Sequence, residues 1–311
     1  MTPFVTGSVA IADEIAAFAD LNLETAIRRE IGKPNGDIYK SDLECLTSLS
    51  ANSEGIIDLT VLQYCTSLTH LSLWNNKISD ISPLSSLASL THLDLGSNQI
   101  ADITPLSNLT SLTWLRLDRN RISDIAPLSN LAGLIHLSLG QNHISDVSPL
   151  SSLASLTHLD IGSNQIADIS PISNLKGLIK LDLQRNQIAD ISPLSNLTSL
   201  IHLYLAENQI DDISPLVENS SLNVGDTLDL RANPLSATSA NVHIPQLEQR
   251  GVNVWLSTSP ISPLASGPDA KASFNLLITI GIIVGLLVAG STAYYFVLLR
   301  RVLRKRALSR R

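Results

Sequence analysis

Apolar residues recur along most of the chain at a fixed spacing of 22 residues. One unit begins at Leu68 and reads LTHLSLWNNKISDISPLSSLAS, and the next unit, from Leu90, repeats its apolar positions. The pattern LxxLxLxxNxIxxIxxLxxLxx holds through seven units, each with an asparagine at the same place: Asn76, Asn98, Asn120, Asn142, Asn164, Asn186 and Asn208. This is a leucine-rich repeat, and repeats of this kind stack on their neighbours. The sequence therefore predicts a solenoid.

Each position of the unit has a mechanical role. Leu71 and Leu73 are two residues apart, so both point inward from a strand, and stacked units place such strands about 4.8 Å apart in one parallel sheet. The asparagine leaves the strand, where its amide can donate to and accept from buried backbone groups. Ser82 and Pro83 suit a helix N-cap and first turn, which predicts a short 3₁₀ or helical turn. The predicted fold class is an α/β solenoid with a parallel sheet on the concave face and short turns on the convex face.

The ends of the repeat array read as caps, because a terminal leucine core must be covered. Residues 21–31 predict an amphipathic helix that ends at Gly32, with Leu23, Ile27 and Ile31 on one face. After the repeats, the sequence predicts a displaced strand at 227–233, a helix near 245–249 and a final strand at 252–256. We divide the chain into an N-terminal segment with a helical cap (1–45), the repeats (46–221), a C-terminal cap (222–256), a Ser/Pro-rich stalk (257–275), a transmembrane helix (276–299) and a basic tail (300–311).

The repeat unit resembles the 22-residue repeats of the bacterial internalin group over roughly residues 46–256. The resemblance implies a slightly curved solenoid whose concave strand face binds a protein partner, and it leaves that partner unnamed. The chain departs from the family after the repeats. It shows neither an LPxTG wall-sorting motif nor an immunoglobulin-like module, and we expect a membrane anchor in their place.

The expected anchor runs from Leu276 to Leu299, which are 24 residues without a charge. At about 1.5 Å per residue, this length exceeds the roughly 30 Å hydrocarbon core of a bilayer. Seven basic groups follow it, and the positive-inside rule then predicts repeats outside and tail in the cytoplasm. The N-terminus lacks the pattern of a signal peptide, so a cytoplasm-facing, tail-anchored scaffold is the alternative. Gly281, Gly285 and Ala289 form a stripe of small residues that predicts self-association into a homodimer.

Composition and charge narrow the function. Two cysteines among 311 residues exclude a disulfide scaffold and a structural zinc ribbon. Residues 1–275 carry 28 acidic and 14 basic side chains, a formal charge of −14, which disfavours nucleic-acid binding. Catalytic motifs such as GxSxG, HExxH or a P-loop are absent from the sequence, so we expect neither an enzyme nor a cofactor.

The candidate site is the concave face, because the residues that flank the inward leucines point outward. The column before Leu71 holds His70, His92, Trp114, His136, His158, Lys180 and His202. The predicted partner site centres where the columns stop repeating, since exposed Trp, Tyr and Arg dominate binding energies. It comprises Trp74, Trp114, Arg116, Asp118, Arg119, Arg121, His136, His158, His202 and Tyr204. Neutral variation of a solvent-exposed face explains the same pattern without a partner.

The histidine column and a column of aspartates could each have a chemical role. Duplication of the repeat accounts for the histidines, but stacked pairs such as His136 and His158 could also bind a metal with Asp160 or form a pH-sensitive strip. A metal-binding surface protein is therefore a third functional hypothesis, although we assign no metal ligand. The aspartates before each Ile-Ser-Pro (or its variant) are expected to accept hydrogen bonds from turn amides. They are Asp80, Asp102, Asp124, Asp146, Asp168, Asp190 and Asp212.

Overall fold

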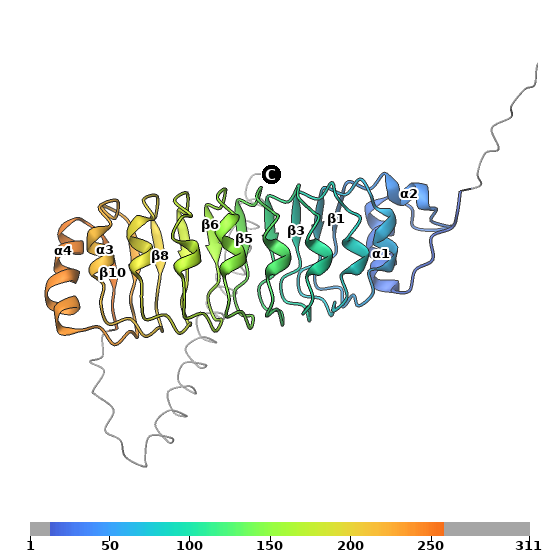
Figure 1. Ribbon diagram of the computed structural model, residues 1–311. Coiled ribbons are helices and arrows are strands. Elements are labelled where there is room, and N and C mark those ends of the chain that lie inside the picture. The colour runs from blue at the N-terminus through green and yellow to red at the C-terminus, as the bar shows by residue number, and fades with distance from the viewer. Residues whose placement is uncertain (1–12, 258–311) are drawn as a thin grey trace, which may run out of the picture. The chain divides into compact units, whose positions relative to one another are not determined.

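The computed structural model describes residues 13–257, in which ten short strands form one parallel sheet. The strands lie in chain order, and helices or turns return the chain from each strand to the next (Figure 1). The strands are β1 (Ser48–Ser50), β2 (His70–Ser72), β3 (His92–Asp94), β4 (Trp114–Arg116), β5 (His136–Ser138), β6 (His158–Asp160), β7 (Lys180–Asp182), β8 (His202–Tyr204), β9 (Thr227–Asp229) and β10 (Asn253–Trp255). The predicted leucine-rich solenoid is confirmed for these residues.

The leucines and isoleucines of the pattern form one continuous core. In the first full unit, Leu71 and Leu73 are 2% and 0% exposed, and the equivalent pairs of later units are buried to the same degree. The strand register aligns each unit with the next, as Leu71 pairs with Leu93 and Leu93 with Leu115. Every unit therefore covers the apolar side of its neighbour, which is why the array needs few aromatic rings.

The asparagines form a ladder of hydrogen bonds through the array. The Nδ2 of Asn120 donates to Leu117 O in its own unit and to Leu95 O in the preceding unit, both at 3.0 Å. Its Oδ1 accepts from the Ile100 N–H at 3.0 Å. Leu117 O also accepts from Asn142, so consecutive asparagines share one carbonyl group. The predicted role of the asparagine is confirmed, and the ladder ties each unit to the next.

The return segments confirm the predicted turns. They are η1 (Thr60–Tyr64), η2 (Ser82–Leu84), η3 (Thr104–Leu106), η4 (Ala126–Leu128), η5 (Ser148–Ser152), η6 (Ser170–Ile172) and η7 (Ser192–Asn196), followed by the helix α3 (Ser214–Glu218). The predicted N-cap role of the serine is wrong, because Ser82 lies inside its turn and its side chain makes no capping hydrogen bond there. Asp80 instead binds the first N–H group of the turn, since its Oδ1 accepts from the Ser82 N–H at 2.8 Å. The same bond recurs at the other aspartates of the column, which confirms their structural role.

The N-terminal cap is helical. Helix α1 (Leu21–Glu30) begins after Asp20, which accepts hydrogen bonds from two N–H groups of the first turn and, through Oδ2, from the Ile57 N–H. Leu23 and Ile27 are buried, as predicted. The helix stops one residue before the predicted end, and the chain reverses at Gly32 with φ +66°. Helix α2 (Lys40–Glu44) follows and leads into β1.

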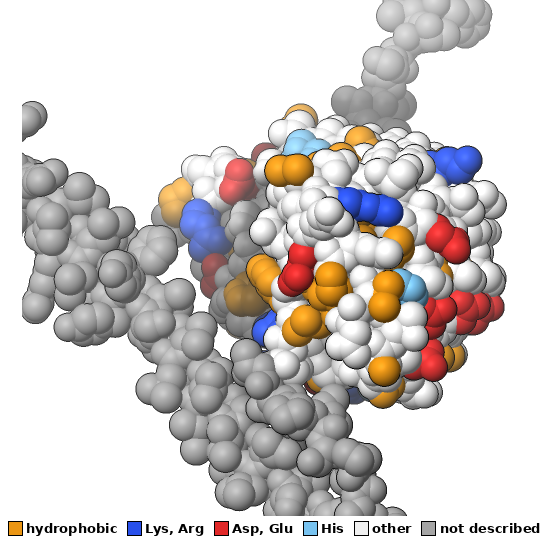
Figure 2. All heavy atoms as spheres, turned by 90° about the vertical axis from the view of Figure 1, so that its left-hand side faces the viewer, with side chains coloured by type: hydrophobic (Ala, Val, Ile, Leu, Met, Phe, Trp, Pro, Cys, Tyr) orange, Lys and Arg blue, Asp and Glu red, His pale blue; other side chains and the backbone are white. Residues whose placement is uncertain are grey.

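The C-terminal cap combines β9, a π turn η8 (Ser239–His243), helix α4 (Ile244–Gln249) and β10. These elements confirm the predicted displaced strand, helix and final strand. Leu247 of α4 is fully buried against the core, whereas Val224 is 79% exposed. Figure 2 views this end and shows hydrophobic side chains scattered over a mostly uncharged surface.

Among residues 13–257, the structure contains no helix long and apolar enough to cross a membrane. The predicted anchor at 276–299, the stalk beyond Ser257, the basic tail and the stripe of Gly281, Gly285 and Ala289 lie outside the described residues.

Candidate functional site

The outward side chains of the strands form three rows across the sheet, and we call these rows together the strand face. Neighbouring residues of a row are paired by the register of adjacent strands, as His136 with His158 and Ser138 with Asp160. The first row is His70, His92, Trp114, His136, His158, Lys180 and His202. The second row is Ser72, Asp94, Arg116, Ser138, Asp160, Asp182 and Tyr204. The third row, just after the strands, is Trp74, Gly96, Asp118, Gly140, Gly162, Gln184 and Ala206.

The rings of the first row stack along the sheet. The ring centroids of His70 and His92 are 4.4 Å apart and those of His136 and His158 are 4.2 Å apart. Trp114 continues the first stack, with its centroid 6.4 Å from that of His92. Partial burial, followed by neighbouring imidazoles, lowers the pKa of His92, and the pKa of His158 is lowered in the same way. Both shifts favour the neutral form of the ring.

Threonine hydroxyls contact three histidines of the first row. The Oγ1 of Thr69 lies 3.0 Å from Thr47 O and 2.9 Å from His70 Nδ1. This contact engages Nδ1, so Nε2 is the ring nitrogen of His70 that remains for a partner. Thr91 and Thr157 make the same pair of contacts beside His92 and His158. The preceding residue of His136 and His202 is isoleucine, so these rings lack the threonine contact.

The glycines of the third row leave room for carboxylates of the next unit. A Cβ at Gly140 would lie 2.9 Å from Asp160 Oδ1, and one at Gly162 would lie 2.9 Å from Asp182 Oδ1. Such distances are too short for real contacts, so any side chain here would displace the carboxylate. The glycines were part of the predicted columns, but their role follows only from contacts between units.

The carboxylates of the strand face fall into two groups. Asp118 accepts from Arg116 Nε at 2.5 Å, and Asp94 lies 3.5 Å from Nη1 of the same arginine. Asp229, at the end of β9, pairs with Arg231 at 2.6 Å. The remaining two, Asp160 on β6 and Asp182 on β7, form hydrogen bonds only with uncharged groups in the described part of the chain.

Asp160 and Asp182 lie side by side on adjacent strands. Asp160 accepts from the Gly162 N–H at 3.0 Å and from the Ser138 hydroxyl at 3.2 Å. Asp182 accepts from the N–H and the side-chain amide of Gln184, at 3.1 and 3.2 Å. Burial, reinforced by the negative charge of Asp160, raises the pKa of Asp182 to about 6. Burial also raises the pKa of Asp160.

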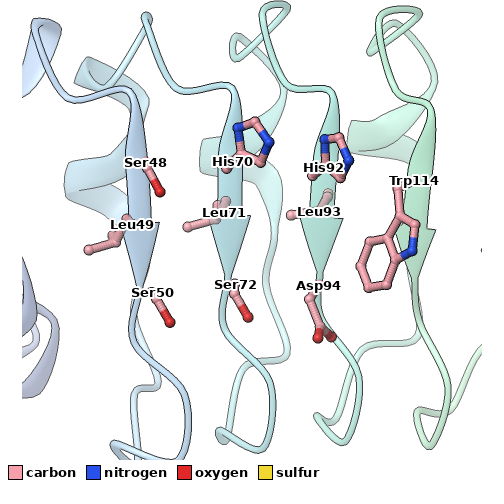
Figure 3. Close-up of a pocket in the computed structure, with 10 residues that line it drawn as sticks. All are labelled: Ser48, Leu49, Ser50, His70, Leu71, Ser72, His92, Leu93, Asp94 and Trp114. Carbon is pink, nitrogen blue, oxygen red and sulfur yellow. The ribbon is translucent and has the colours of Figure 1, made fainter.

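Two shallow hollows follow the strand face and meet at Trp114. One, of about 280 Å³, is lined by residues of β1 to β4, and its side chains are drawn in Figure 3. The other, of about 340 Å³, extends from Trp114 to Lys180 and includes His136, His158 and Asp160. Trp114 is therefore the shared wall of the two hollows.

The structure divides the predicted partner site. Trp74, Trp114 and the two stacked rings His136 and His158 are half-buried on the strand face, as are His202 and Tyr204. Arg116 is also on this face, but two carboxylates hold it.

Three predicted contact residues lie at or beyond the end of β4. Asp118, in the third row, is only 8% exposed and pairs with Arg116, so it offers little surface to a partner. Arg119 adopts a φ of +56° in the turn beyond the strand. Arg121 follows that turn, with its Nη2 3.4 Å from Gln99 Oε1. β4 ends at Arg116, so both arginines belong to the segment after the strand, where Arg119 Nε lies 3.9 Å from Asp118 Oδ2. Their role in binding stays a prediction.

The described residues supply no third ligand for the metal site considered from the sequence. Among residues 13–257, no group of three His, Cys, Asp or Glu side chains converges in a way that could hold a metal ion. The stacked histidine pairs present parallel rings, and the neighbouring carboxylates bond to backbone and hydroxyl groups instead.

Comparisons with known proteins agree with this architecture. A family model described as leucine rich repeats (2 copies) matches residues 66–108, 110–152, 133–174 and 176–218. No curated protein matches the sequence. The crystal structure of an internalin C2 from Listeria monocytogenes is 36% identical, with a TM-score of 0.65, and the match covers 69% of this chain and 97% of that one.

More distant structures share the fold. A leucine-rich repeat protein of Leptospira interrogans is 22% identical with a TM-score of 0.61, covering 70% of this chain and 62% of that one, and at this identity the likeness concerns the fold alone. The ectodomain of the Arabidopsis thaliana membrane receptor kinase GASSHO1/SCHENGEN3, solved in complex with CASPARIAN STRIP INTEGRITY FACTOR 2, is 27% identical with a TM-score of 0.54. That match covers 67% of this chain and 27% of the receptor chain. The chain belongs to the leucine-rich repeat family and, within it, is similar to the internalins of Listeria.

Proposed function

We propose that this chain is a membrane-anchored recognition protein that binds another protein through its strand face. The observation that carries the proposal is the contrast between a uniform scaffold and a varied surface. The inward Leu, Ile and Asn positions repeat from unit to unit, whereas the second row changes from Ser to Asp, Arg and Tyr. A rigid sheet that presents varied, half-exposed rings and charges suits recognition of a partner surface.

Two further observations support protein binding. The hollows of the strand face meet at Trp114, a residue type that is enriched at binding hot spots. The plant ectodomain that shares the fold is the leucine-rich repeat part of a membrane receptor kinase, and it was solved in complex with a partner. The proposed role is binding without catalysis, since the hollows are open surfaces and the sequence lacks catalytic motifs.

The anchor and its orientation form part of the proposal. The uncharged stretch from Leu276 to Leu299 supplies the anchor, and the seven basic residues after it support a cytoplasmic tail with extracytoplasmic repeats. Protease treatment of intact cells tests the orientation. Loss of the repeats with retention of a tail epitope is expected, whereas full protection with cleavage only after lysis would favour the cytoplasm-facing scaffold.

Site-specific photo-crosslinking tests the binding face. A photoreactive residue is placed at His136 on the strand face or, as a control, at the exposed Ser151 of the return segment, in cells that express the chain. We expect a discrete protein adduct from position 136 alone. A Trp114→Ala variant should lose the adduct, while Trp255→Ala, which removes the same side chain outside both hollows, should retain it. Adducts of equal yield from both positions, or none from position 136, would refute the proposed face.

A further inference from the structure

The one arginine of the second row is already paired. Arg116 donates to Asp118 and lies beside Asp94. It is therefore not free to bind a carboxylate of a partner, which disfavours an acidic partner on this face.

The carboxylates of β6 and β7 favour a basic partner. Asp94, Asp118 and Asp229 each have an arginine within 3.5 Å. Asp160 and Asp182 are equally part of the sheet surface and are adjacent in register, yet their partners within the described residues are uncharged. Two neighbouring carboxylates repel each other when both are charged, and a cation seated between them offsets that repulsion.

Lys180, on the same strand as Asp182, is the cationic side chain of the first row. Its charge opposes the rise in the pKa of both carboxylates, but its Nζ lies over the ring of Tyr204, 5.7 Å from the centroid, and within the described residues it forms no ion pair with Asp160 or Asp182. Asp160 lines the hollow of about 340 Å³ together with His136 and His158, so an incoming side chain has space beside the pair. Residues 13–257 also carry 27 acidic and 13 basic side chains, a balance that attracts a basic partner at long range.

We infer that the strand face binds a basic segment of a protein partner, with a Lys or Arg side chain seated against Asp160 and Asp182. The aliphatic part of that side chain lies along the stacked rings of His136 and His158. The inference rests on the proposed function and adds the chemical class of the partner.

A peptide-display selection tests the inference on the full chain in mild detergent. A random library of twelve-residue peptides is selected on the wild type and on the double variant Asp160→Asn/Asp182→Asn. The asparagines retain Oδ1 as an acceptor for the N–H groups of Gly162 and Gln184, so the variant is expected to fold, and circular dichroism checks this. Lys and Arg should be enriched among peptides selected on the wild type, and this enrichment should disappear on the double variant.

The matched control is Asp146→Asn/Asp168→Asn. These residues belong to two adjacent units, are exposed, and form the same kind of bond to a backbone N–H, so the charge change is identical but lies on the return segments. The control should retain the enrichment. By fluorescence anisotropy, the most enriched peptide should bind the strand-face variant at least tenfold more weakly than wild type, and the control within about twofold.

Three results would overturn the inference. They are selected peptides without Lys or Arg enrichment, enrichment that survives on Asp160→Asn/Asp182→Asn, and equal loss of affinity in the two double variants. Photo-crosslinking at His136 is scored separately. An adduct there combined with any of these results leaves the proposed function standing and removes only the basic partner, whereas the absence of an adduct together with any of these results removes both the proposed face and the basic partner.

Discussion

Replacement of Asn142 by alanine measures the asparagine ladder directly. The side chain of Asn142 is 6% exposed and lies in the middle of the array. Its Nδ2 donates to Leu117 O at 3.0 Å and to Leu139 O at 2.9 Å, and its Oδ1 accepts from the Ile122 N–H at 3.0 Å. Alanine removes all of these bonds and leaves a small cavity.

The consequences differ among the three backbone groups. Leu117 O keeps a hydrogen bond from Asn120, and Leu139 O keeps one from Asn164, because the ladder shares each carbonyl between two asparagines. Each of these carbonyls loses one of two bonds, at about 0.5–1.5 kcal/mol. The Ile122 N–H loses its partner entirely, at about 1–3 kcal/mol for a buried donor. The expected decrease in the free energy of unfolding is therefore about 2–6 kcal/mol.

The comparison variant is His136→Ala, which removes a half-exposed ring from the same unit. It loses the stack with His158, worth about 0.5–1.5 kcal/mol. Urea denaturation followed by circular dichroism should show a clearly lower midpoint for Asn142→Ala than for His136→Ala. Equal midpoints would refute the ladder as a source of stability.

Asn142→Asp refines the test. The aspartate retains an acceptor for the Ile122 N–H but has no N–H to donate to Leu117 O and Leu139 O, and its charge faces both carbonyls. At neutral pH the aspartate should be at least as destabilising as alanine. Acidification should raise the stability of the Asn142→Asp variant relative to that of Asn142→Ala, since a protonated carboxyl can donate to one carbonyl. An aspartate variant as stable as wild type at pH 7 would show that the donors contribute nothing.

Three further outcomes are expected. Because the folded pKa of Asp182 is raised to about 6 from 3.8, the fold penalises its charged form, so Asp182→Asn should stabilise the protein above pH 6. That gain should vanish below about pH 4 in thermal melts, and a gain independent of pH would contradict the assignment. Gly140→Ala should lower the melting temperature, and Asp160→Ala in the same chain should relieve the effect by removing the crowded carboxylate; simple additivity of the two changes would argue against this contact. Cross-linking of the full chain in membranes should yield a dimer that Gly281→Ile/Gly285→Ile abolishes, and an undiminished dimer would exclude the small-residue stripe as the interface.

The fold was largely predictable because the information is local and repeated. Leu71, Leu73 and Asn76 recur in every unit with the same spacing, and each unit contacts only its neighbours, so the structure of one unit implies that of the array. The caps were predictable for a related reason, since Leu23 and Ile27 show helical spacing next to a core that must be covered. The serine N-cap was wrong because the turn begins at Ser82 itself. The Leu84 and Ser85 N–H groups donate to the Ile81 and Ser82 carbonyls, and Asp80 accepts from the Ser82 N–H.

The chemistry of the site depended on contacts that the spacing does not encode. The columns placed Asp94, Arg116 and Asp118 near one another, but only the rotamers show that Arg116 holds both carboxylates and that Asp118 is buried. Asp160 and Asp182 belong to the same columns and remain without an arginine, because the corresponding positions beside them are occupied by glycine, serine and glutamine. Side chains 22 residues apart become neighbours only when the units stack, so the tertiary structure decides which carboxylates pair with an arginine and which bond only to uncharged groups.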